Sequence, residues 1–243
     1  MSKKISLKQF LMKSGKFDKA YDCEKFIREK KVTIGNKIII NPNYFFNPKK
    51  SLVKINNEKI RKAPKLYFLI NKPSGYLSQK AENEKTIYSF IDKLNIPEEH
   101  KKSLFAVGRL DNDTEGLMII TNDGQLSSVI MNPESEINKR YSVILEKPIS
   151  DENIKLLEKG VVIEVDDSKF KTTKCKIKKV NEKEAYISIT EGKKRQIRKM
   201  FEAIGNNVFY LKRVSIGGLQ LENLKVGEIR KISKEEIIEK LEF

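Results

Sequence analysis

The chain of 243 residues contains no tryptophan and a single histidine, His100. Its only cysteines, Cys23 and Cys175, lie far apart and lack C-x-x-C spacing. This scarcity argues against a Cys/His zinc site and against a histidine-based catalytic triad. Two isolated cysteines in a chain of this length are typical of a reducing cytosol, where we expect them to be small core residues.

Long apolar runs are also missing. No uninterrupted apolar segment approaches the about 18 residues that a membrane-spanning helix needs, and the first residues are not followed by an apolar signal core. We therefore expect a soluble, cytoplasmic, monomeric protein without a membrane partner. The length allows two modest domains, each with a core of its own.

Acidic residues are few relative to basic ones. The chain has 49 Lys and Arg against 33 Asp and Glu, a formal net charge of +16. Residues 1–65 hold 18 of the basic and 5 of the acidic residues, a net charge of +13, which leaves +3 for residues 66–243. Such a charge indicates a polyanionic partner, and the N-terminal quarter is its predicted contact.

The most informative stretch is 108–124, GRLDNDTEGLMIITNDG. Its apolar second half, 117–121, ends at an Asn-Asp-Gly turn signal and predicts a buried strand. Its polar first half predicts a loop, supported by that strand, which carries one arginine and three acids: Arg109, Asp111, Asp113 and Glu115. Clustered carboxylates repel one another unless cations neutralise them, so one of the three is a candidate reactive group. Their spacing lacks the glycine and terminal glutamate of a calcium-binding EF-hand loop.

The decapeptide GRLDNDTEGL resembles the catalytic loop of RNA pseudouridine synthases, in the ribosomal RNA branch with an N-terminal S-four RNA-binding domain. The resemblance implies that Asp111 is the catalytic residue. It also implies site-specific isomerisation of uridine to pseudouridine in ribosomal RNA, with the target base flipped out of its stack. This chemistry needs neither cofactor nor metal.

Further motifs extend the resemblance. Residues 139–143 are similar to the family's K-x-Y-x-V strand, which implies that Tyr141 is its active-site tyrosine. Residues 191–201 match EGxxRQIRxMF, which implies that Arg198 lies against the catalytic carboxylate, and helical spacing predicts that Arg195 shares its face. Leu211 corresponds to the residue that packs on the target base.

The turn at 71–75 resembles the NKPxG turn that opens the family's catalytic domain. It frames the core, or it contacts the RNA backbone through Lys72, and both interpretations stay open. The same holds for Arg109, which pairs either with an acid of its own loop or with RNA phosphate. With Leu211 and Arg195, these two residues form the candidate substrate-binding set.

The N-terminal part has two predicted helices within 5–30, a hairpin at 32–40 and a strand at 52–55. This pattern is similar to the S-four RNA-binding domain, although that domain's usual arginines are replaced here. Six lysines are expected to keep the basic face: Lys13, Lys16, Lys19, Lys25, Lys30 and Lys31.

These patterns predict an α+β fold, with a small helix-helix-strand RNA-binding domain at 1–62, a linker at 63–65 and a catalytic domain at 66–243. The resemblance implies a mixed, mainly antiparallel sheet in the larger domain. Its predicted helices are 86–94, 125–131, 150–159, 191–204 and one that begins at 233, and Ser150, followed by two acids, is the expected N-cap of the third. Its predicted strands include 66–70, 104–107, 139–145 with alternating apolar and polar residues, 170–180, 185–190 and 207–217.

Two other classes of function remain open. A non-catalytic RNA-binding protein of ribosome assembly would explain the charge, but it leaves an acidic loop in a basic protein without a purpose. A nuclease would use the clustered acids to hold magnesium.

Overall fold

A computed structural model of the protein describes residues 4–241 and divides the chain into two compact units. The N-terminal unit comprises residues 1–66 together with 91–105, and the larger unit comprises 67–90 and 106–243. The first break lies one residue beyond the predicted linker. Residues 91–105, however, group with the N-terminal unit, although the sequence places them within the catalytic domain.

The N-terminal unit begins with two helices, as predicted: α1 (Leu7–Met12) and α2 (Ala20–Arg28). Ser6 caps α1, since its side chain accepts a hydrogen bond from the Gln9 backbone N–H. An antiparallel sheet of order β3-β2-β5-β6 follows, with β2 (Val32–Ile34), β3 (Lys37–Ile38), β5 (Val53–Ile55) and β6 (Glu58–Ile60). A short pair joins β1 (Ile5–Ser6) to β4 (Phe45–Phe46). The helices bury Leu7, Leu11 and Ile27 completely, which gives this unit its own core.

Residues 91–105 contribute α4 (Glu98–Ser103) to the same unit. Glu99 pairs with Lys16, and Lys102 pairs with Asp18 at 3.2 Å. The helix predicted at 86–94 is much shorter, α3 (Tyr88–Ile91). Around it the N–H groups of Phe90 and Leu94 bond to carbonyls three residues back, as in turns, which ends the helix early.

The larger unit is built on a nine-stranded sheet whose main path is β13-β14-β10-β15-β9-β7-β17. Neighbours along this path are antiparallel except β9 and β15, which run parallel. The strands are β7 (Tyr67–Lys72), β8 (Phe105–Ala106), β9 (Glu115–Thr121), β10 (Lys139–Leu145), β13 (Lys176–Lys179), β14 (Glu184–Ile189), β15 (Val208–Ile216), β16 (Leu219–Gln220) and β17 (Ile229–Lys231). The predicted α+β class with a mainly antiparallel sheet is confirmed.

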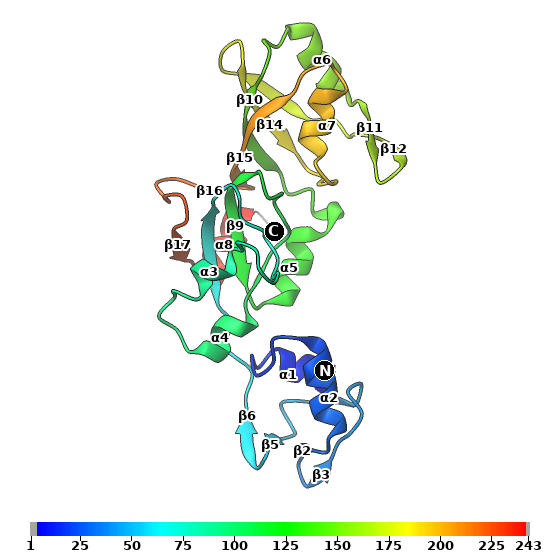
Figure 1. The fold of residues 1–243 in the computed structure, drawn as a ribbon, viewed down its shortest axis with the longest axis vertical. Helices are drawn as coiled ribbons and strands as arrows, with labels where there is room; N and C mark the ends of the chain where they lie inside the picture. The colour runs from blue at the N-terminus through cyan, green and yellow to red at the C-terminus, as the bar shows by residue number, and fades with distance from the viewer. Residues whose placement is uncertain (1–3, 242–243) are drawn as a thin grey trace. The chain divides into compact units, whose positions relative to one another are not determined.

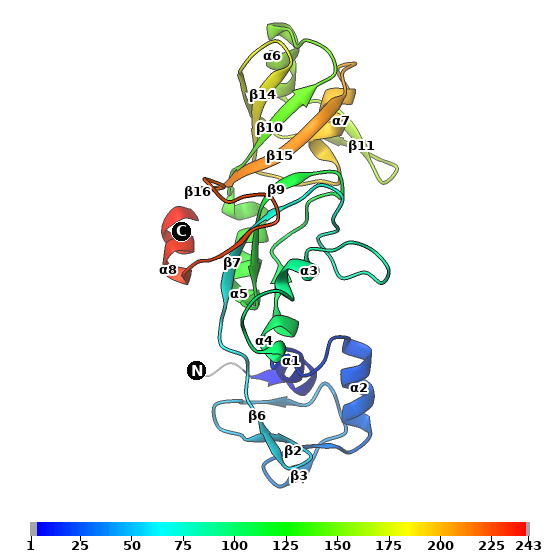
Figure 2. The same cartoon turned by 60° about the vertical axis from the view of Figure 1, so that its left-hand side comes forward.

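Four helices of this unit are α5 (Gly124–Met131), α6 (Asp151–Lys159), α7 (Gln196–Glu202) and α8 (Lys234–Leu241), with a 3-10 turn at η1 (Pro133–Ser135). Ser150 caps α6 as predicted, accepting a hydrogen bond from the Asn153 N–H. Helices α6 and α7 both lie on one side of β10, β14 and β15 (Figures 1 and 2). The alternation along β10 agrees, because Tyr141, Val143 and Leu145 are buried while the residues between them are only half-buried.

The prediction of one continuous strand at 170–180 is wrong, because the strand is interrupted between Lys171 and Lys176. Its first part forms a hairpin of β11 (Val162–Val165) with β12 (Ser168–Lys171), and its last part is β13. Between them the backbone turns away to bond elsewhere: the N–H of Thr172 donates to Val161 and that of Cys175 to Glu158. The predicted strand is therefore interrupted by backbone bonds to the end of α6 and to the residue that precedes β11.

Both cysteines are buried core residues, as predicted, and neither is in a disulfide. Burial raises the pKa of the Cys23 thiol to about 11 and that of Cys175 to about 12. Between residues 4 and 241, the helices are all too short or too polar to cross a bilayer.

Candidate active site

The loop of the GRLD motif runs from β8 to β9 in the larger unit, and buried polar groups hold its backbone. The Ser78 hydroxyl donates to the carbonyl of Leu110 at 2.8 Å and accepts from its N–H at 3.0 Å. One residue further on, the carbonyl of Asp111 accepts from the Thr114 N–H at 3.1 Å and closes a turn. No pattern in the sequence indicated Ser78, since a serine after the turn is ordinary in loops.

The NKPSG turn, residues 71–75, is hydrogen-bonded to the loop at Asn112, the residue after Asp111. The carbonyl of Asn112 accepts from the Gly75 N–H at 2.8 Å and from the Lys72 ammonium at 3.2 Å, and the same ammonium donates to the Pro73 carbonyl at 2.9 Å. Lys72 is 0% exposed. Burial lowers its pKa to about 8, against the opposing effect of the loop carboxylates. Its predicted contact with RNA is therefore not supported, because the side chain is enclosed and props the loop instead.

Two arginines clamp Asp113. The Arg195 guanidinium forms a two-point contact with its carboxylate at 3.2 and 3.1 Å, and Arg198 approaches one carboxylate oxygen at 3.2 Å. Arg195 adopts a left-handed backbone conformation, with φ of 53°, directly before α7. Both guanidinium groups thus reach the Asp113 carboxylate, and the two side chains point the same way, as their spacing predicted. Only Arg198, however, is part of the helix.

Arg198 also holds the backbone around the loop. Its side chain is 8% exposed and donates to the Val208 carbonyl at 2.8 Å and to the Asp113 carbonyl at 3.1 Å. The resemblance implied that Arg198 lies against Asp111. In this structure its carboxylate partner is Asp113, two residues further along.

Glu115 is the first residue of β9 and not part of the loop, a correction to the predicted boundary. It pairs with Lys212 at 2.7 Å. Burial, with Glu115 close by, raises the pKa of the Tyr210 hydroxyl to about 12. Asp113 and Glu115 thus each have a cationic partner.

Asp111 differs from its two acidic neighbours. Its half-buried carboxylate forms no ion pair and accepts no hydrogen bond from any residue between 4 and 241. Arg109 is exposed and likewise has no carboxylate partner in the described part of the chain. Of the two interpretations of Arg109, the one that pairs it with an acid of its own loop is not realised.

Gly116 fixes where the loop joins the sheet. Its φ is 122°, and a Cβ atom there would lie 2.2 Å from the carbonyl oxygen of Arg213 on β15. Only glycine allows β9 and β15 to approach this closely and run parallel. The close approach of the two strands therefore explains why the motif GRLDNDTEGL has glycine at position 116.

Tyr141 and Leu211 lie on one face of the sheet. Tyr141 is paired with Arg213, and Val143, two residues along, is paired with Leu211, so both side chains point to the same side. Because the residues on this side of β10 and β15 are the buried ones, and α6 and α7 cover one side of these strands, this is the side that the helices cover. Tyr141 is 8% and Leu211 4% exposed, so both surfaces are nearly closed to solvent.

The six predicted RNA-contacting lysines are all exposed in the N-terminal unit. At least two of them have acidic partners: Lys16 pairs with Glu99 and Lys31 with Glu29. Their charge is partly neutralised by neighbours that periodicity could not identify. The basic face is therefore weaker than the count of lysines suggests.

No group of three His, Cys, Asp or Glu side chains within residues 4–241 is placed to hold a metal ion. What the site offers is one carboxylate without a partner, on a loop held by a buried lysine, a buried serine and two arginines. A carboxylate held in this way can act as a nucleophile or as a general base.

Comparison with known proteins identifies the family. Residues 66–203 match the RNA pseudouridylate synthase family. The chain is 35% identical over 213 residues to "Ribosomal small subunit pseudouridine synthase A" of Salmonella typhimurium, covering 87% of this chain and 89% of that protein. It is 32% identical over 221 residues to "Ribosomal large subunit pseudouridine synthase B" of Bacillus subtilis, covering 88% and 87%.

A solved structure, "Crystal structure of pseudouridylate synthase", matches the fold with a TM-score of 0.69 and 29% sequence identity. It covers 98% of this chain, and this chain covers 99% of it. Together with the family match over more than half of the chain, these likenesses establish that the protein belongs to the RNA pseudouridine synthases, which are isomerases.

Proposed function

We propose that this chain isomerises a specific uridine of ribosomal RNA to pseudouridine, with Asp111 as the catalytic carboxylate. The observation that carries the assignment of Asp111 is its lack of a partner, while Asp113 and Glu115 are both ion-paired. A carboxylate already held by arginine or lysine has its charge stabilised in the resting enzyme and is a weaker nucleophile or base. Relatives named for small- and large-subunit RNA support ribosomal RNA as the substrate class.

The reaction breaks the bond between N1 and C1′, turns the uracil and rejoins it through C5. The base cannot turn while stacked, so it is flipped into the site, at least cost from a loop or bulge. Asp111 attacks or takes a proton, while Lys72 and Arg198 keep its loop in place. Arg109, exposed beside the loop, contacts RNA phosphate.

Pseudouridine mapping tests this function. In a deletion strain we expect one pseudouridine to be missing from ribosomal RNA, small or large subunit, and to return with the wild-type gene. The purified protein should release tritium from RNA labelled at uridine C5, since the new bond displaces that hydrogen, and should do so in EDTA.

An unchanged map would contradict the proposal. RNA binding without tritium release would favour a non-catalytic assembly protein. RNA cleavage that EDTA abolishes would favour a magnesium-dependent nuclease.

Tyr141 and Leu211 are proposed to hold the flipped base between an aromatic and an apolar surface. Both lie on the same face of the sheet, and both are nearly buried, so the base enters a site already lined with apolar groups. Because phenylalanine retains the aromatic ring, Tyr141→Phe should keep substantially more single-turnover activity than Tyr141→Leu. Equal losses in the two variants would assign the role to the phenolic hydroxyl instead.

The N-terminal unit is proposed to be an S-four-like RNA-binding domain that uses its exposed lysines. Because residues 91–105 fold with this unit, the full-length protein is the right test, and a truncation at 62 is not. In the variant Lys13→Gln/Lys25→Gln/Lys30→Gln, filter binding should show weaker affinity. The slope of log K against log salt should fall by about 0.7 for each lost phosphate contact on single-stranded RNA. An unchanged slope would remove these lysines from the interface.

A further inference from the structure

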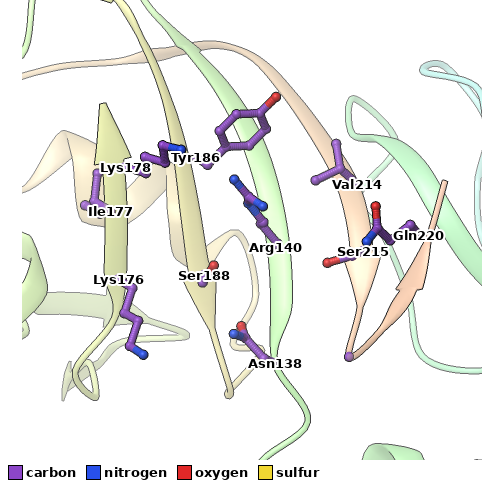
Figure 3. Close-up of a pocket in the computed structure, with 11 residues that line it drawn as sticks. Asn138, Arg140, Lys176, Ile177, Lys178, Tyr186, Ser188, Val214, Ser215 and Gln220 are labelled. Atoms are coloured by element: carbon purple, nitrogen blue, oxygen red, sulfur yellow. The ribbon is translucent and has the colours of Figure 1, made fainter. Parts of the chain in front are cut away.

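A second charged surface lies on the larger unit, on the side of the sheet away from α6 and α7 (Figures 1 and 3). In β10, Arg140 points to the opposite side from Tyr141, and in β14 its paired residue Ser188 does the same, as does Tyr186. Together with Lys176 and Lys178 on β13, these side chains line a hollow of about 550 Å³. We call this surface the open face.

The charge of the open face has one sign. Its eleven lining residues include three cations, Arg140, Lys176 and Lys178, and no acid. None of the three cations forms an ion pair with a carboxylate between residues 4 and 241, in contrast to Lys212, Arg195 and Arg198 elsewhere in the unit. The remaining lining groups include neutral hydrogen-bonding side chains such as Asn138, Ser215 and Gln220. Unpaired cations among neutral donors match an anionic ligand.

Arg140 is positioned as a phosphate-binding arginine. Its guanidinium carbon lies 4.2 Å from the centre of the Tyr186 ring. Stacking fixes the plane of the guanidinium group and leaves its N–H groups at the edge, where they can reach a phosphate in two-point geometry. Figure 3 shows both side chains rising from the sheet into the hollow.

A simpler explanation covers only part of this surface. Lysines on an edge strand discourage pairing with other chains, and β13 is the edge of the sheet. Arg140, however, lies on β10, two strands in from that edge, where the backbone is paired with a strand on both sides. The positive charge continues inward across the sheet, so edge protection does not explain it.

We propose that the open face binds the sugar–phosphate backbone of the RNA substrate at a segment remote from the target uridine. Arg140 and Tyr141 are consecutive and point to opposite sides of the sheet, so the phosphates held here cannot belong to the nucleotide in the catalytic site. The open face therefore contributes to affinity for long RNA and not to the chemical step. The proposal rests on RNA being the substrate.

The test is the variant Arg140→Gln/Lys176→Gln/Lys178→Gln in the full-length protein. The matched control is Lys155→Gln/Lys159→Gln, which removes two exposed charges from α6. A second variant, Lys176→Gln/Lys178→Gln, changes only exposed residues and guards against misfolding through loss of the Arg140–Tyr186 stack. Filter binding is measured across a salt series with full-length ribosomal RNA and with the shortest RNA that the enzyme modifies.

With full-length RNA, we expect the triple variant to bind about 10- to 100-fold more weakly at low salt. Its salt slope should be lower by about 2, since about 0.7 is lost for each phosphate. The double variant should show about two-thirds of that change in slope, since it loses two of the three contacts, and the α6 control should match wild type. With the shortest RNA at saturation, single-turnover rates should be unchanged in all variants.

Three results would overturn the proposal: wild-type affinity and slope in the triple variant, the same loss in the α6 control, or a slower chemical step on the short RNA. Normal binding of naked RNA with lost association to the assembling ribosomal particle would also overturn it, in favour of an acidic protein partner. Filter binding tests the open face and does not depend on turnover, whereas tritium release tests the isomerase activity. A failure of one proposal can therefore be distinguished from a failure of the other.

Discussion

Asp111→Asn should lower the single-turnover rate of tritium release at least about 10³-fold, which corresponds to about 4 kcal/mol of transition-state stabilisation. Asparagine keeps the size of the side chain but removes its charge and its nucleophilicity. Because Asp111 has no ion pair within the described residues, the free energy of unfolding of the variant, measured in urea, should be within about 0.5 kcal/mol of the wild-type value. RNA affinity should be unchanged or slightly tighter, since an anion near phosphates is gone.

Neighbouring acids provide the controls for this result. Asp113→Asn should cost stability, because Arg198 is buried and loses its charged partner, but it should cost less activity than Asp111→Asn. Glu115→Gln breaks the pair with Lys212 and changes the contact with the Tyr210 hydroxyl, neither of which involves Asp111, so it should retain most of the activity. If Asp111→Asn stays within tenfold of wild type while Asp113→Asn is inactive, the catalytic residue has been assigned to the wrong acid.

Arg198→Met should lower the free energy of unfolding by about 3 kcal/mol. The substitution leaves the carbonyls of Val208 and Asp113 without their donor, in a place closed to water. The loop that carries Asp111 then loses one of its fixed points. A displacement of the order of an ångström is expected to slow catalysis about 100-fold.

Arg195→Met is the matched control, since both arginines bind the same carboxylate. Arg195 and Asp113 are 41% and 47% exposed, so this pair is solvated and should contribute less than about 1 kcal/mol. Urea unfolding and single-turnover tritium release should therefore separate the two variants clearly. Equal stability of Arg195→Met and Arg198→Met would show that Arg198 does not anchor the loop.

Local patterns in the sequence determined much of the fold. The alternation of residues 139–145 predicted β10 with its observed bounds, and a serine followed by two acids predicted the capped start of α6. These features depend on residues within a few positions of one another, so periodicity and capping chemistry are sufficient. The resemblance of the GRLD, NKPxG and RQIR motifs indicated the family that the comparisons establish.

Other local predictions were wrong where distant contacts decide the outcome. The strand predicted at 170–180 is interrupted because its backbone bonds to the end of α6. For Lys72 the sequence left two interpretations open, and the contact that separates them is a distant one: its buried ammonium donates to the carbonyl of Asn112, forty positions away.

The partners of the acids at the site were decided by the tertiary structure alone. In sequence, Asp111, Asp113 and Glu115 are three equivalent carboxylates, and any could face the arginines of the RQIR motif. The parallel approach of β9 and β15 at Gly116 sets where the loop ends, and Arg198, 85 positions away, meets Asp113 and not Asp111. A side chain reaches only a few ångströms, so the backbone path selects which carboxylate is paired and which one is left for chemistry.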